Sequence, residues 1–213
     1  ITRAAQTNTA PVARNDVGVI AEDSTLSVSN GANANVSGSY DATGEHSGDV
    51  INTSSTTHYD TDADSDTLTV TAIRIGGTEG SGTAGTVGSA LTGTYGQLTL
   101  NANGSYSYVA NQAAADALDA GDTATDIFNY TLSDGTATDT ATITITVTGI
   151  NDAPVAANDT GSVNEDATLT VSDGSGDIIA DNDTDADDSA SLVVSAIRTG
   201  GTEGSGTAGT VGS

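Results

Sequence analysis

Residues 140–150 read TATITITVTGI, and residues 67–75 read TLTVTAIRI. In both stretches small polar residues alternate with apolar ones at a period of two, which is typical of a β-strand with one buried face. Phe128, Tyr130 and Leu132 follow the same period in a third stretch, so they are expected to share one face of a strand. The chain is therefore predicted to consist of β-strands that each bury one side.

Turn signals separate these strands. Residues 97–109 (QLTLNANGSYSYV) predict a hairpin, because Asn103-Gly104 tolerates the positive φ that a tight turn requires. Asp134-Gly135 predicts a second turn of this kind between the last two strands. Only residues 112–120 have a helical pattern, for two turns at most. Short strands between frequent turns predict an all-β fold, an antiparallel β-sandwich.

The chain repeats itself. Several motifs occur twice: GGTEGSGTAGTVGS at 76–89 and 200–213, APVARND at 10–16 with APVAAND at 153–159, and DTDAD at 60–64 and 183–187. Between matching motifs the first copy is longer, and its surplus around residues 31–57 predicts a surface loop insertion. We therefore divide the chain into three parts: 1–8, a linker or the end of a preceding repeat; 9–150, a complete sandwich; and 151–213, the N-terminal half of a second repeat, without a counterpart of residues 90–149.

Composition excludes several classes of function. The formal net charge is -25, with 29 acidic residues against four arginines and no lysine. Such a surface repels nucleic acid and anionic membranes, and no apolar run is long enough to insert into a membrane. Cysteine is absent, and both histidines, His46 and His58, lie in the insertion, which leaves little for catalysis. Divalent cations would offset the charge, although acidic surfaces also serve solubility alone.

Two acidic clusters are candidate calcium sites. DTDADSD at 60–66 and DNDTDADD at 181–188 place aspartates at alternate positions, and calcium takes six to eight oxygen ligands. An EF-hand does not fit, because Ser65 stands at its sixth position and Thr71 at its twelfth. The alternative is a solvated acidic turn without metal. Gly80, Gly82 and Gly85 match a dinucleotide-binding pattern, but residues 86–96 lack the helix that such a site needs, so a flexible loop is expected.

One family resembles this pattern. The motifs that carry the resemblance are NDAPVAAND at 151–159, Glu165-Asp166, NDTDAD at 182–187, and LSDGTATDTATITITVTGINDAP at 132–154. Together they resemble the VCBS and cadherin-like repeats of large bacterial adhesins of the RTX type. The resemblance implies tandem Ig-like sandwiches, an extracellular or bacterial cell-surface location, and a role in adhesion or biofilm.

The resemblance also implies calcium at the junctions between repeats. Its ligands would come from three groups: Glu22, Asp23, Asp119 and Asp122 at the lower end of the first repeat, Asn151 and Asp152 in the linker, and Asp183, Asp185 and Asp187 at the upper end of the second repeat. The equivalent upper end of the first repeat would carry Asp60, Asp62 and Asp64. There Thr9 replaces the linker aspartate, which weakens the expectation of a fully occupied site.

These observations favour a non-enzymatic stalk module of an adhesin, stiffened by calcium and packed against neighbouring repeats of its own chain. One alternative is a subunit of a self-assembling filament or surface layer, completed by strands from a neighbouring subunit. Another is an accessory carbohydrate-binding module of a secreted enzyme, with Tyr40, Tyr59 and Tyr95 as weak candidates for contacts to sugar. A surface glycan or protein receptor would be the external partner.

Overall fold

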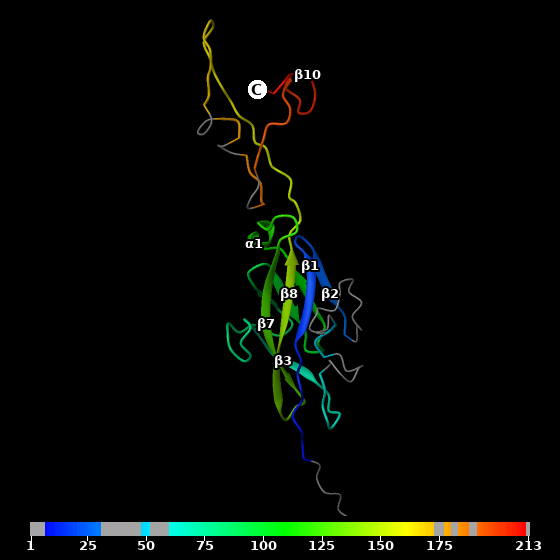
Figure 1. Cartoon of the computed structure of the whole chain (residues 1–213). Helices are drawn as coiled ribbons and strands as arrows, with labels where there is room; N and C mark the ends of the chain where they lie inside the picture. Colours follow the sequence, from blue (N-terminus) through cyan, green and yellow to red (C-terminus); the bar gives the residue numbers. More distant parts are fainter. Residues whose placement is uncertain are drawn as a thin grey trace, which may run out of the picture. The chain divides into compact units, whose positions relative to one another are not determined.

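The structure is a computed structural model that describes residues 7–30, 48–51, 60–172, 177–179, 183–187 and 191–211. The chain divides after Ile150 into two compact units, a first unit of residues 1–150 and a second unit of residues 151–213 (Figure 1). In the described part of the chain, no helix has the length and apolar character needed to cross a membrane.

The first unit is a β-sandwich of two four-stranded sheets, which confirms the predicted all-β fold. One sheet has the order β1-β8-β7-β3 (Figure 1). The other sheet has the order β2-β6-β5-β4. The elements are β1 (Asp16–Ala21), β2 (Thr25–Val28), β3 (Thr69–Ile75), β4 (Ala90–Thr92), β5 (Gln97–Leu100), β6 (Tyr106–Val109), α1 (Ala113–Asp116), β7 (Thr123–Ser133) and β8 (Thr138–Thr148). The helix has four residues, fewer than the 112–120 pattern allowed.

The core lies between the two sheets and follows the predicted period of two. On β7 the side chains of Phe128, Tyr130 and Leu132 are buried, as expected from their spacing. Tyr108 of the opposite sheet meets Phe128 edge to face, with ring centroids 6.5 Å apart and planes at 69°. Alternation therefore decides which side of each strand faces the core, because successive side chains of a strand point to opposite faces.

The two predicted turns form with the expected backbone. Gly104, in the loop between β5 and β6, adopts a φ of +88°, and Gly135, between β7 and β8, adopts +95°. Asp134 strengthens the second turn, because its carboxylate accepts hydrogen bonds from the backbone N–H groups of Thr136 (2.6 Å) and Ala137 (2.7 Å). These bonds lower the pKa of Asp134.

One strand pair is parallel, which the sequence did not predict. β1 runs parallel to β8, with Asp16 opposite Ile143 and Ala21 opposite Thr148. A parallel pair needs a long connection, and here almost the whole first unit provides it. As a result, β1 and β8 end at the same edge of the sheet, so the residues after Ala21 lie beside those after Thr148.

Of the predicted surface insertion, the structure describes residues 48–51. Residues 31–47 and 52–59, which include His46, His58, Tyr40 and Tyr59, lie outside the described residues. Between them, however, Val50 is 1% exposed, and its N–H donates to the carbonyl of Gly104 (3.1 Å). The prediction of a surface loop is therefore wrong for residues 48–51, because this short apolar piece covers the β5–β6 hairpin.

The glycine-rich segment folds back on β3. The Ile75 N–H donates to the Thr83 carbonyl (2.9 Å), and Arg74 forms an isolated bridge with Ala84. In the second unit the identical segment gives β9 (Arg198–Thr199) and β10 (Thr207–Ala208), paired antiparallel. In the first unit the buried Asn129 of β7 also holds this segment, with its amide donating to the carbonyls of Gly76 and Ser81.

The described part of the second unit exposes residues whose counterparts form the first core. Leu169 is 51% exposed and Ile197 53%, whereas Leu26 and Ile73 at the equivalent positions are 7% and 1% exposed. In the first unit these residues belong to the buried core between the two sheets. In the described part of the second unit their counterparts are accessible.

Candidate metal centre

The acidic loop at residues 60–66 brings three carboxylates together. One oxygen from each of Asp62, Asp64 and Asp66 lies within 4.8 Å of the others. The loop winds around Asp62, whose Oδ1 accepts hydrogen bonds from the N–H groups of Asp64 (2.8 Å) and Asp66 (3.1 Å). Aspartate favours such local turns because its short side chain reaches the backbone two residues ahead. Alternate aspartates are thereby gathered on one side of a turn.

The incoming segment is fixed to this loop by backbone contacts. Val12 and Thr61 exchange two hydrogen bonds of 2.8 and 3.0 Å, and the Thr9 N–H donates to Asp64 Oδ2 (2.7 Å). Two small cavities border the loop, one of about 210 Å³ beside Asn8 and Asp64, the other of about 330 Å³ beside Asp60 and Asp62. Oxygen-rich space is therefore present where a hard cation could bind.

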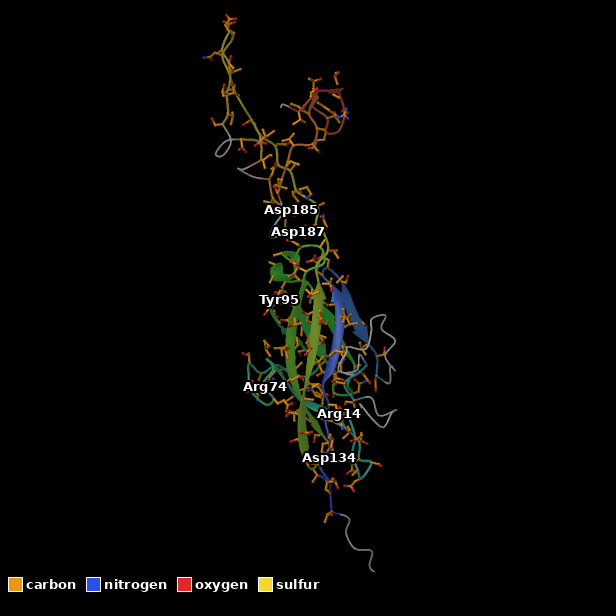
Figure 2. All side chains as sticks on the ribbon, viewed as in Figure 1. Arg14, Arg74, Tyr95, Asp134, Asp185 and Asp187 are labelled. Atoms are coloured by element: carbon orange, nitrogen blue, oxygen red, sulfur yellow. The ribbon has the colours of Figure 1, made fainter. Side chains whose placement is uncertain are left out.

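The second unit repeats this geometry. Val155 and Thr184 form the equivalent bridge, and the Asp152 N–H donates to Asp187 Oδ2 (3.1 Å) in the place of the Thr9–Asp64 bond. Asp185 then accepts from the Asp187 N–H (3.1 Å), as Asp62 does from Asp64. Figure 2 shows the side chains of Asp185 and Asp187. The two acidic motifs therefore share this bridge and turn, whereas the position of Asp66 is Ser189 in the second repeat.

Asp60 faces the interior rather than the group of Asp62, Asp64 and Asp66. Its side chain is 4% exposed, and its Oδ1 accepts a hydrogen bond from the Arg14 N–H (2.7 Å). Burial raises the pKa of Asp60 to about 7, the Arg14 hydrogen bond opposes this, and the nearby Asp139 carboxylate adds to the rise. In the second unit Asp183 occupies the equivalent position, and it accepts from the Ala157 N–H (2.7 Å).

Of the predicted Asp60, Asp62 and Asp64, the structure brings Asp62 and Asp64 together with Asp66, whereas Asp60 is buried. Asp66 takes the place of Asp60, because the loop turns after Asp62 and directs Asp60 the other way. The sequence indicated Asp66 as a member of this group, because Asp66 continues the alternation of aspartates that begins at Asp60.

The predicted ligands at the other end of the first unit lie near one another along its edge. Glu22 is fully buried, and its carboxylate accepts a hydrogen bond from the Ile150 N–H. Asp122 binds the same terminal segment, with its carbonyl accepting from the Gly149 N–H (2.9 Å) and its N–H donating to Asp119 (2.8 Å). Asp23 is exposed with a φ of +56°. Within the described residues, the set of three carboxylates with metal-ligand spacing is Asp62, Asp64 and Asp66. Glu22, Asp23, Asp119 and Asp122 do not belong to it.

In the linker, the Asn151 side chain donates to the carbonyl of Asp152.

Tyr95, proposed as a sugar contact, is partly buried against the core, and its N–H donates to the buried Asp126 (3.0 Å). Asp126 also accepts from the Thr94 and Gly96 N–H groups and from the Tyr108 hydroxyl. Tyr95 thus lies in a turn that Asp126 holds together, and this carboxylate has a structural role.

Comparison with known proteins gives one family. The family model described as bacterial cadherin-like domain matches residues 8–149. No curated protein matches the sequence. Among solved structures, the chain is similar to an endo-fucoidan hydrolase, MfFcnA4 from glycoside hydrolase family 107, with 21% identity and a TM-score of 0.31. The similarity covers 72% of this chain and 17% of that chain, so it spans less than a fifth of the hydrolase and carries no argument about activity.

Proposed function

Because the chain belongs to the bacterial cadherin-like domain family, we propose that it is a non-enzymatic extender module of an extracellular bacterial adhesin or biofilm protein, stiffened by calcium at the junctions between its repeats. Domains of this family are typically extracellular or on the cell surface. The neighbouring repeats of the same chain are its first partners, and a glycan or protein receptor on another surface is the external one.

The observation that carries this proposal is the group of Asp62, Asp64 and Asp66. Three carboxylates within 4.8 Å repel one another, in a chain whose formal net charge is already -25. A calcium ion turns this repulsion into coordination, because it binds six to eight oxygens in flexible geometry. Since the ion binds only the ordered loop, it stabilises the fold by mass action.

The recurrence of the device supports a structural role. Both repeats fix their acidic loop to the incoming segment through the same bridge, Val12 to Thr61 and Val155 to Thr184. A ligand that orders the loop therefore also orders the segment that leads into each repeat. Restricting the segments between repeats is what a stalk needs to resist bending.

Calcium titration tests the proposal. At a concentration 100 times Kd, one site contributes about 2.7 kcal/mol, which raises Tm by roughly 5–10 °C for a chain of this length. The Asp62→Asn, Asp64→Asn, Asp66→Asn triple variant should lose this rise, whereas Glu79→Gln with Glu203→Gln, exposed carboxylates at equivalent positions of both repeats, should keep it.

Small-angle scattering provides the second measurement. Chelation should shorten the maximum dimension of the wild-type particle, and readdition of calcium should restore it. If Tm rises with calcium while the particle dimension stays constant, calcium binds but does not stiffen the junctions. If neither quantity responds, the acidic loop serves solubility and the calcium proposal is wrong.

A second candidate function is assembly into a filament. It is favoured by the accessible side chains of Val163, Leu169 and Val171, which are 54%, 51% and 50% exposed. Strands from a neighbouring copy would cover them by β-augmentation. Light scattering distinguishes the two functions, since a monodisperse monomer at high concentration contradicts the filament.

A further inference from the structure

The first unit begins and ends on adjacent strands. The chain enters it through β1 and leaves it through β8, and these strands pair in parallel along the six residues of β1, Asp16 to Ala21. Parallel pairing places the segment before β1 and the segment after β8 at opposite ends of the sheet (Figure 1). A force that pulls on both ends of the unit therefore acts along β1 and β8 in opposite directions.

The direction of this force decides how the ladder between β1 and β8 resists it. Hydrogen bonds of a parallel ladder run across the gap between the strands and are evenly spaced. A force along the strands loads all of these bonds together, so they must break together before the strands slide. A force across the strands loads them one after another from one end. The same ladder therefore withstands more force along the strands than across them.

Contacts before β1 extend this ladder towards the start of the unit. The Ala13 N–H donates to Asp139 Oδ2 (2.9 Å), and Asn15 Oδ1 accepts from the Thr142 N–H (3.0 Å). Asp139 and Thr142 both belong to β8. The segment that leads into β1 is therefore bound to β8 from Ala13 onwards.

Contacts after β1 extend the ladder towards the end of the unit. The Glu22 N–H donates to the carbonyl of Thr148 (3.0 Å), and the buried Glu22 carboxylate accepts from the Ile150 N–H. Ile150 is the last residue of the first unit. The complete terminal-strand interface is therefore formed by residues 13–22 on one side and 139–150 on the other.

The rest of the sandwich lies between these two segments in the sequence. Residues 23–138 contain β2 to β7 and most of the buried core. While the terminal-strand interface holds, a pulling force passes directly from residues 13–22 to residues 139–150. The core strands are then extended only after this interface has broken.

We propose that the first unit bears tension along the stalk, and that the terminal-strand interface is the element that carries the load. The inference rests on the proposed function as an extender module, because a stalk that joins two surfaces is pulled from both ends when they separate. Its load-bearing contacts are separate from the candidate calcium group. The incoming segment contacts the acidic loop through Val12 and Thr61, whereas the terminal-strand interface is formed with β8 and the residues that follow it.

Single-molecule pulling of the full chain in two directions, in the presence of chelator, tests the proposal. Handles at both termini load the interface along its strands. The chain has no cysteine, so Ser24→Cys with Ile150→Cys, both at exposed positions, provides specific attachment points for a second direction. These two positions follow β1 and β8 at the same edge of the sheet, so the force peels the ladder from one end.

End-to-end pulling should break the first unit at the higher force. The event is assigned to this unit by the length of chain that it releases, since residues 13–150 extend to at most about 500 Å. Equal rupture forces in the two directions would overturn the proposal. They would mean that the fold breaks at a place other than the terminal-strand interface.

Two variants show which contacts carry the force. Asn15→Ala removes the bond to the Thr142 N–H and should raise the end-to-end rupture rate at constant force about fivefold, the equivalent of one net hydrogen bond. Asp126→Asn is the matched control, because its partners Thr94, Gly96 and Tyr108 lie within residues 23–138. It should lower the unfolding midpoint in urea and leave the end-to-end rupture rate unchanged.

The rates of these variants also decide against the proposal if they take the opposite order. A rupture rate that responds to Asp126→Asn as much as to Asn15→Ala, or that does not respond to Asn15→Ala, would mean that the core bears the force. Because the pulling is done in chelator, a chain whose melting temperature and dimensions ignore calcium can still show the expected rupture forces. The calcium proposal and the tension proposal therefore fail separately.

Discussion

Replacing Asp60 by asparagine gives a direct measure of how much the buried carboxylate costs the fold in the absence of calcium. The structure places Asp60 at 4% exposure, and burial raises its pKa from 3.8 to about 7. Between pH 4 and 7 the folded protein therefore retains a proton that the unfolded chain has released. The free energy of unfolding falls as pH rises through this window, and above pH 7 it no longer changes through this group.

The difference of about three pKa units corresponds to about 4 kcal/mol at 1.36 kcal/mol per unit. Asparagine stays neutral at every pH, and its Oδ1 can still accept the Arg14 N–H. Asp60→Asn should therefore equal the wild type in stability near pH 4 and exceed it by up to about 4 kcal/mol at pH 8. Urea unfolding in chelator, from pH 4 to 8, measures this difference.

Comparison of the two proteins at each pH isolates Asp60, because all other carboxylates titrate in both. Glu79→Gln controls for the loss of one charge, since exposed substitutions change stability by less than about 0.5 kcal/mol. A difference between wild type and Asp60→Asn that stays constant across the pH range would refute the reasoning. It would mean that the interior solvates this carboxylate in its charged form.

Asp126→Asn should destabilise the first unit by about 2–4 kcal/mol in urea unfolding. One carboxylate oxygen accepts from the Tyr108 hydroxyl, and the substitution replaces an oxygen with an amide donor. An unchanged unfolding midpoint contradicts the structural role of this carboxylate. Gly18→Val should lower the free energy of unfolding by about 1–3 kcal/mol or more, because a Cβ there would lie 2.7 Å from Ile145 Cδ1. Val19→Ala, at an exposed position of the same strand, is the control. Appending a copy of residues 90–150 after Ser213 should bury Leu169. In a hydrogen-exchange measurement the new tertiary contacts should appear as slowly exchanging amides. Continued exposure of Leu169 would contradict the alignment of the repeats.

The sequence determined the local structure because its signals are local. Alternation along 140–150 gives a buried face on β8, and Gly104 and Gly135 supply the positive φ of their turns without a steric penalty. The repeated motifs also indicated that both acidic loops would fold alike, and the bridges at Val12 and Val155 agree with that expectation. Neither conclusion needed contacts between distant segments.

Which acidic residues act together depends on contacts between segments that are far apart in the chain. Alternation along 60–66 does not show where the chain turns, and the turn after Asp62 leaves Asp66 beside Asp62 and Asp64 and leaves Asp60 in the interior. The parallel pairing of β1 with β8, and the burial of Asp49 within a predicted surface loop, depend on segments far apart in the chain. Periodicity shows which side of a segment is apolar, whereas packing determines which segments pair. Packing also places the Asp16 carboxylate beside the Tyr130 hydroxyl.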